Sequence, residues 1–148
     1  MARISVSVTI GAPVERVWQV VEPIERHVDW MADAVAIRFT GQQTRGTGTE
    51  FECDTKVGPF TLVDKMTVTS WEPLREMGVR HSGIVTGSGV FTLAPAPQGG
   101  TVFTWTESLV FPWWMGGPVG AFVGGKVVMR LIWVRNLKKL KKIAEAAA

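Results

Sequence analysis

The chain has one cysteine, two histidines and no long apolar run, and each of these scarcities excludes a class of protein. The lone cysteine, Cys53, rules out an internal disulfide and suits a reducing compartment, so we expect a cytoplasmic location. The histidines show no familiar metal-binding spacing with Cys53, and we expect neither a metal nor a cofactor. No uncharged apolar run approaches the roughly 18 residues of a membrane span. The first residues alternate in polarity, and no signal peptide is expected.

The excess of positive charge lies in one short segment, and the rest of the chain is close to neutral. The net charge is +3, and four lysines lie within Lys138–Lys142. A nucleic-acid-binding protein spreads basic charge over a face and interleaves it with exposed aromatic residues, so we expect no nucleic-acid partner. The lysine cluster is interpreted as a solvated helix end, whose contact with anionic lipid would be at most transient.

The length of the chain favours one domain. A chain of 148 residues that is 46% hydrophobic can bury a sizeable core. No internal repeat and no interdomain linker is visible. We therefore expect a single domain over residues 1–148, as a monomer or a homodimer.

The C-terminal stretch, Pro118–Ala148, is the segment around which the rest is organised. Its apolar residues recur at spacings of three and four, which predicts one long amphipathic helix. They are Phe122, Met129, Trp133, Leu137, Leu140 and Ala144. Five glycines between Gly116 and Gly125 weaken the first turns, so this helix is loose there or begins near Gly125. The glycines either let helix and sheet approach closely or form a gate over a pocket.

The preceding residues predict short strands and two short helices. The strands alternate apolar and polar residues, so each has one buried face. They cover about 4–10, 35–39, 51–57, 60–71, 77–85, 91–93 and 103–111, and the helices follow the first strand at about 13–21 and 24–29. Short turns make neighbouring strands antiparallel. The predicted fold is α+β, a curved seven-stranded antiparallel sheet wrapped around the long C-terminal helix.

Three short motifs carry a resemblance to a known family. They are Ile10–Trp18, with its Ala-Pro step and Val-Trp pair, Gly46–Thr49 between two strands, and Trp71–Pro73 at a strand end. With the order of elements, they resemble the polyketide cyclase/dehydrase and lipid-transport family of the START-like (Bet v 1-like, SRPBCC) helix-grip superfamily. The resemblance implies a helix-grip fold with a hydrophobic cavity between sheet and long helix. Members bind or process lipids, sterols, polyketides and plant hormones, and no catalytic set transfers.

Strand alternation places two titratable side chains together on the apolar face. If Trp71 lies opposite Glu76, His81 lies opposite Met66, and Asp64 is a diagonal neighbour at about 7–8 Å. The carboxylate would orient the imidazole and raise its pKa, which makes His81 a candidate general base. The alternatives are that the two side chains satisfy one another at the cavity wall or that they orient a ligand.

A third acidic residue, Glu107, shares that face but is predicted to stand apart. Counting through two more strands puts it about 10 Å or more from the pair. It would either reach water at the end of its strand or contact a ligand. Cys53 is expected to be an inert thiol, and His27 to lie on an exposed helix face. The Trp113-Trp114 pair would plug the core, form a rim at the pocket or touch a membrane interface.

The expected ligand contacts are apolar, with two polar exceptions. They are Phe51, Met66, His81, Phe91, Phe103, Trp105, Glu107, Phe122, Met129 and Trp133. An empty hole of about 300 Å³ would cost several kcal/mol at roughly 24 cal/mol per Å³, so the cavity must hold ligand or water or be plugged. The many aromatic rings on this face could narrow it severely.

Three functions are consistent with this pattern. The first is binding of a hydrophobic small molecule, lipid-like or polyketide-like, for transport or sequestration. The second is a polyketide cyclase or dehydratase that uses His81 and Asp64 as its acid–base pair. The third is an interaction module with a collapsed core and no ligand.

Overall fold

The structure, a computed structural model, describes residues 2–57, 60–112 and 126–146. Three of the predictions lie outside these residues. They concern the Trp113-Trp114 pair, the first part of the C-terminal helix with Phe122, and the gate between Gly116 and Gly125.

The described strands form one antiparallel seven-stranded sheet, which confirms the predicted fold class. Its order is β1-β7-β6-β5-β4-β3-β2, so only β1 leaves its sequence neighbours to pair with β7. The strands are β1 (Ala2–Ile10), β2 (Ala34–Phe39), β3 (Glu50–Val57), β4 (Phe60–Glu72), β5 (Glu76–Ser82), β6 (Thr86–Pro95) and β7 (Thr101–Val110). On each strand the residues of one face are buried or half-buried, as their alternation predicts.

Two short helices connect β1 to β2, as predicted. Helix α1 (Val14–Val21) begins after Pro13, and the 3₁₀ helix η1 (Ile24–Asp29) begins after Pro23. Proline suits these positions because its missing N–H would have no partner in a first helical turn. The loop between β6 and β7 contains one further turn of 3₁₀ helix, η2 (Pro97–Gly99).

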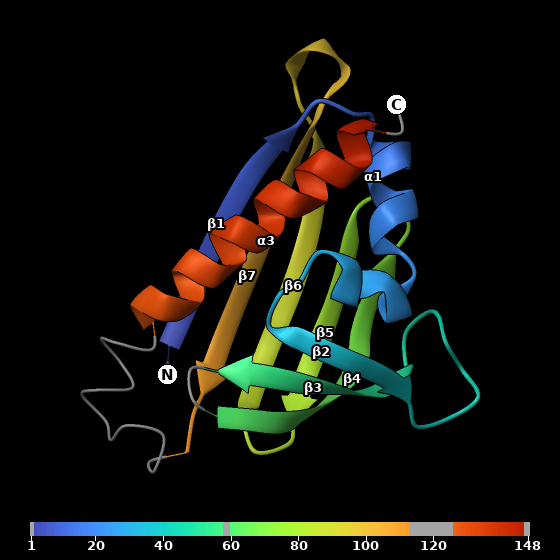
Figure 1. The fold of residues 1–148 in the computed structure, drawn as a ribbon. Helices are drawn as coiled ribbons and strands as arrows, with labels where there is room; N and C mark the ends of the chain where they lie inside the picture. The colour runs from blue at the N-terminus through green and yellow to red at the C-terminus, as the bar shows by residue number, and fades with distance from the viewer. Residues whose placement is uncertain (1, 58–59, 113–125, 147–148) are drawn as a thin grey trace.

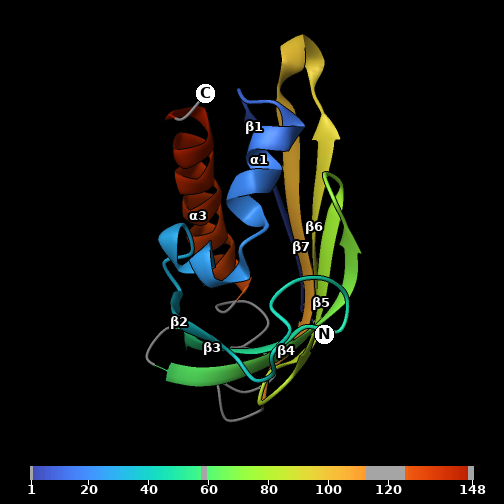
Figure 2. The same ribbon diagram turned by 90° about the vertical axis from the view of Figure 1, so that its right-hand side faces the viewer.

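The long helix α3 (Lys126–Ala146) closes the concave side of the sheet. Figure 1 shows it running diagonally across β1 and β7, with α1 beside its C-terminal end. Figure 2 shows that β2, β3 and β4 turn away from the long strands and curve beneath the helices. In the described part of the chain, no helix is both long and apolar enough to cross a membrane.

A bulge in β4 corrects the predicted register of the β4–β5 hairpin. Glu76 lies opposite Glu72, one residue from the predicted partner Trp71. The register shifts by one residue between Val68 and Ser70, and beyond this bulge Met66 lies opposite His81, as predicted. The one-residue error in the register near the turn and the one-residue shift at the bulge cancel. An extra residue in one strand displaces every later pair by one.

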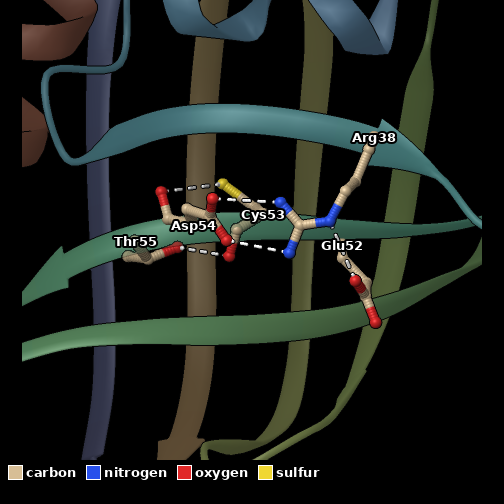
Figure 3. A network of polar contacts seen from close by, with 5 residues as sticks. All are labelled: Arg38, Glu52, Cys53, Asp54 and Thr55. Carbon is tan, nitrogen blue, oxygen red and sulfur yellow. Dashed lines mark hydrogen bonds and ion pairs between the residues drawn. The ribbon is translucent and has the colours of Figure 1, made fainter.

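The outer face of β2 and β3 carries a surface ion-pair network (Figure 3). The Arg38 guanidinium donates to both carboxylate oxygens of Asp54, at 2.9 and 3.0 Å, and its Nε donates to Glu52 at 3.0 Å. Glu52 lies directly opposite Arg38 across the ladder. Because the arginine is half exposed, water screens these pairs, and they add little to the stability of the protein. The network reinforces the pairing of β2 with β3.

Truncating a core residue of α3 should cost far more than truncating an exposed one. Leu140 is fully buried, whereas Leu131, on the same helix, is 62% exposed. We expect Leu140→Ala to lower the free energy of unfolding by about 2–5 kcal/mol and Leu131→Ala by less than about 0.5 kcal/mol. Urea denaturation measures both. Equal effects would contradict the placement of α3 on the sheet.

Candidate functional site

A cavity of about 100 Å³ lies between the curved sheet, η1 and α3. Most of its lining is apolar, and every strand except β1 contributes to it. Among the residues predicted to contact a ligand, the lining includes Phe51, Met66, His81, Phe91, Trp105, Glu107, Met129 and Trp133. The space predicted between sheet and helix therefore exists in the folded chain.

Aromatic packing narrows this cavity. Trp105 stacks on Trp133 of α3 with ring centroids 4.5 Å apart. Phe103, expected to contact a ligand, is instead fully buried between Trp30 and Phe91 and is not part of the lining. The resulting volume is somewhat smaller than the roughly 150 Å³ engineered cavity that accommodates benzene.

Methionine side chains give the cavity walls room to adapt. Met31, Met66, Met77 and Met129 come from four different parts of the chain and all line the cavity. A methionine side chain is unbranched and changes rotamer at small cost, which lets it fill or vacate irregular space. Rotamer changes of these four side chains can therefore alter the shape and volume of the cavity.

The polar part of the wall is centred on His81. Its Nδ1 lies 2.9 and 3.0 Å from the carboxylate oxygens of Asp64, which confirms the predicted pairing of these two residues. Its Nε2 lies 3.2 Å from Oε1 of Glu107. The histidine side chain is 5% exposed and the two acidic side chains are 14% and 11% exposed. The three residues form a buried carboxylate–imidazole–carboxylate group, called the His81 triad below.

The position of Glu107 corrects the prediction that it stands apart from the pair. Glu107 lies opposite Gly89 of β6, and His81 lies opposite Gly87 of the same strand. A Cβ added to Gly89 would come within 2.4 Å of Oε1 of Glu107. The backbones are two strands apart, but β6 presents no side chain between them, so the carboxylate crosses the gap. The count along the strands failed because it considered only the distance between backbones. It did not consider that the β6 glycines between Glu107 and His81 have no side chain.

The triad fixes the protonation state of His81. Burial alone would lower the pKa of the imidazole, but its hydrogen bonds to Asp64 and Glu107 outweigh burial and raise this pKa to about 10. At neutral pH the ring is therefore an imidazolium that donates one N–H to each carboxylate. A general base needs a free lone pair, so the proposed role of His81 as a base is not supported by this geometry.

A second polar contact at the cavity joins the loop after η1 to α3. Asn136 donates to Oδ1 of Asp33 at 2.8 Å and accepts from the backbone N–H of Ala32 at 2.9 Å. Burial raises the pKa of Asp33, which lines the cavity, while hydrogen bonds from Asn136 and Trp133 lower it. Neither Asp33 nor Asn136 was predicted from the sequence. The available signal was an asparagine seven residues after Met129, on the apolar side of the helix.

The location of His27 corrects a second prediction. The residue is buried, not exposed, and packs against Trp30 and Phe91. Its Nε2 lies 2.7 Å from the carbonyl oxygen of Val21, so this nitrogen carries the proton. Burial lowers the pKa of His27 to about 4, and the ring is neutral. η1 places it on the inner side because the 3₁₀ helix lies across the concave face of the sheet.

Cys53 behaves as the sequence suggested. The thiol is buried, and burial raises its pKa to about 11, so it stays protonated and unreactive at neutral pH. Within the residues that the structure describes, no three histidine, cysteine or acidic side chains are arranged to hold a metal ion. The polar groups of the site include those of the His81 triad and Asp33, set in a mostly apolar wall.

This geometry defines a helix-grip protein, in which a curved antiparallel sheet and a long helix enclose an apolar cavity. The profile of a family described as polyketide cyclase / dehydrase and lipid transport matches residues 1–145. The chain belongs to this family, which confirms the resemblance drawn from its motifs. No curated protein matches the chain.

Solved structures share the fold at low sequence identity. The Zhui aromatase/cyclase from Streptomyces sp. R1128 superposes with a TM-score of 0.73 at 18% identity, covering 97% of this chain and 93% of its own. A protein from Thermus thermophilus gives 0.75 at 16% identity, covering 99% of each chain. A conserved protein from Geobacillus kaustophilus gives 0.73 at 20% identity, covering 96% and 94%. At these identities the likeness shows the fold alone.

Adding one methyl group at Gly89 should separate Glu107 from His81. Because the clash is with Oε1, Cγ and Cδ of the Glu107 side chain and not with backbone atoms, we expect Gly89→Ala to fold with this side chain displaced. The pKa of His81 should then fall from about 10, since one of its two acceptors is lost. NMR titration of the imidazole C–H signals measures this pKa. Gly41→Ala, where an added Cβ meets nothing within 4 Å, is the control. An unchanged His81 titration would contradict the triad.

The triad also predicts how stability varies with pH. The pKa of His81 is 6.5 in the unfolded chain and about 10 in the folded protein, so its contribution is complete below pH 6.5 and is lost as pH rises toward 10. We expect the free energy of unfolding to fall by up to about 1.4 kcal/mol per pH unit between roughly pH 6.5 and 8.5. Urea denaturation at several pH values measures this decline.

The two histidine variants provide the controls for this decline. His81→Gln should abolish it. His27→Gln should keep the decline. The pKa of His27 is lowered to about 4, so its contribution to stability changes only when the pH falls below 6.5. The same slope in His81→Gln would assign the decline to other groups.

Proposed function

We propose that this protein binds a small hydrophobic molecule in the cavity between the sheet and α3. The observation that carries the proposal is the lining itself, which is apolar around most of its surface and polar at the His81 triad and Asp33. Ligand sites in proteins combine an apolar wall with a few convergent polar groups that fix the orientation of the ligand. Family membership supports the same function, because the family's description names lipid transport.

The size of the cavity favours a compact ligand. A volume of about 100 Å³ suits a single ring or a short chain better than an extended lipid. The stacked rings of Trp105 and Trp133 offer a flat wall against which a ring of polyketide type can pack. We therefore favour a compact cyclic ligand over a long-chain lipid, to be carried or sequestered in the cytoplasm.

A narrowed cavity should lose its ligand. Ala34 lines the cavity, whereas its neighbour Val35 on the same strand is 54% exposed. We expect 2-phenylethanol, a neutral single-ring probe, to change the tryptophan fluorescence of the native protein on binding. Ala34→Leu should weaken this binding at least about tenfold, because the larger side chain occupies ligand space. Val35→Leu, on the opposite face of β2, should bind the probe as the native protein does.

Two results would contradict the proposal. One is the absence of any binding by the native protein to 2-phenylethanol and to xenon, which would favour an interaction module without a ligand. The other is equal binding by both variants, which would place the probe outside the cavity. Native mass spectrometry of gently purified protein adds a direct test, because a retained apolar adduct supports the binding function.

The second candidate is a polyketide cyclase or dehydratase. Its support is a carboxyl group, Asp33, whose pKa is raised by burial at the cavity wall, since acid–base catalysis uses such groups. The likeness to an aromatase/cyclase is compatible with this alternative. His81 and Asp64 would serve to position the substrate, because both imidazole nitrogens are already engaged. Turnover of a linear poly-β-ketone thioester that disappears in Asp33→Asn, with folding retained, would establish catalysis.

A further inference from the structure

The cavity carries more negative than positive charge. Its described lining includes three carboxyl groups, those of Asp33, Asp64 and Glu107, and no lysine or arginine. The single positive group in this lining is the imidazolium of His81. Even without Asp33, the two carboxylates of the triad outnumber the one imidazolium. This excess lies in an apolar wall, where a charge acts more strongly than it does in water.

The hydrogen-bond donors of the wall are largely used within the protein. His81 donates one N–H to Asp64 and the other to Glu107, and His27 donates its N–H to the Val21 carbonyl oxygen. The hydroxyl of Thr55 donates to the Cys53 carbonyl at 3.3 Å. The indole N–H of Trp105 is a lining donor with no acceptor in the described part of the chain, and it carries no charge.

The hydrogen-bond capacity that remains is mostly that of acceptors. Glu107 uses Oε1 for His81, and its Oε2 makes no hydrogen bond to the described residues. The neutral ring of His27, protonated at Nε2, presents Nδ1 as an acceptor. A ligand that donates hydrogen bonds would satisfy these groups, and one that carries positive charge would also offset the charge of the wall.

We propose that the ligand of this cavity is a compact apolar amine, bound as its cation with the ammonium group at the His81 triad. The inference rests on the proposed binding function and adds the charge class of the ligand. An apolar carboxylate of the same size is disfavoured, because it would bring a second acceptor and a like charge to the triad.

A matched series of ligands tests the charge class. 2-Phenylethylamine, 2-phenylethanol and phenylacetate share one ring and a two-carbon arm and are cationic, neutral and anionic, respectively, at pH 7. Isothermal titration calorimetry on the native protein should show the amine binding about tenfold or more tightly than the alcohol, and phenylacetate more weakly than both. Phenylacetate binding as tightly as the amine would overturn the proposal.

Removing one negative charge locates the effect. Glu107→Gln keeps an amide oxygen for the His81 N–H and should reduce the affinity for the amine about tenfold, and the affinity for 2-phenylethanol by a clearly smaller factor. Glu50→Gln, at an exposed position at the start of β3, also removes one negative charge and should change neither the affinity for the amine nor that for 2-phenylethanol. Equal effects of the two variants would overturn the proposal. If Glu107→Gln does not fold, the ligand series on the native protein decides.

The outcomes separate this inference from the binding function on which it rests. Binding of 2-phenylethanol without any preference for the amine overturns the inference and leaves the binding function standing. Failure of all three probes to bind overturns both.

Discussion

Burial of the concave face of the sheet against α3 governs the architecture of this protein. Seven strands present apolar side chains to the same side, and a sheet of this size cannot leave that side in water. Helix α3 supplies the cover through Trp133, Leu137, Leu140 and Ala144, all of them buried. The curvature of β2, β3 and β4 then leaves a space that α3 does not fill, and this space is the cavity.

The polar groups inside that space follow a different constraint. A carboxylate taken out of water must be paired, and Asp64 and Glu107 meet this need with one imidazolium between them. The pairing depends on four strands: β4, β5 and β7 carry Asp64, His81 and Glu107, and Gly89 of β6 leaves room for Glu107 to reach β5. A protonated histidine held in this way is a fixed part of the wall and is better suited to orienting a ligand than to abstracting a proton.

The outside and the inside of the protein differ in the sign of their charge. The chain as a whole carries a net charge of +3, whereas the cavity lining is acidic. The lysines that produce the positive balance lie near the end of α3, and Lys141 there pairs with Glu145 and donates to the Thr9 carbonyl. Overall charge is therefore a poor guide to the ligand, because Asp33, Asp64 and Glu107 line the cavity whereas no described lysine or arginine does.

The order and type of the elements, the buried face of each strand and the family could all be predicted from the order of the amino acids. These properties are local: alternation along a strand, a proline before each short helix and helical spacing in the C-terminal stretch act over a few residues. They also sufficed to pair His81 with Asp64, because one hairpin joins the two strands.

The position of Glu107, the burial of His27 and the Asp33–Asn136 contact emerged only from the folded chain. In each case the partners come from separate elements or non-adjacent strands, and at Gly89 what joins them is space left by a neighbour. The volume of the cavity was also decided only in the folded chain. It is the small difference between the space that the sheet and the helix enclose and the volume of the aromatic rings that fill this space. No local sequence pattern fixes such a difference.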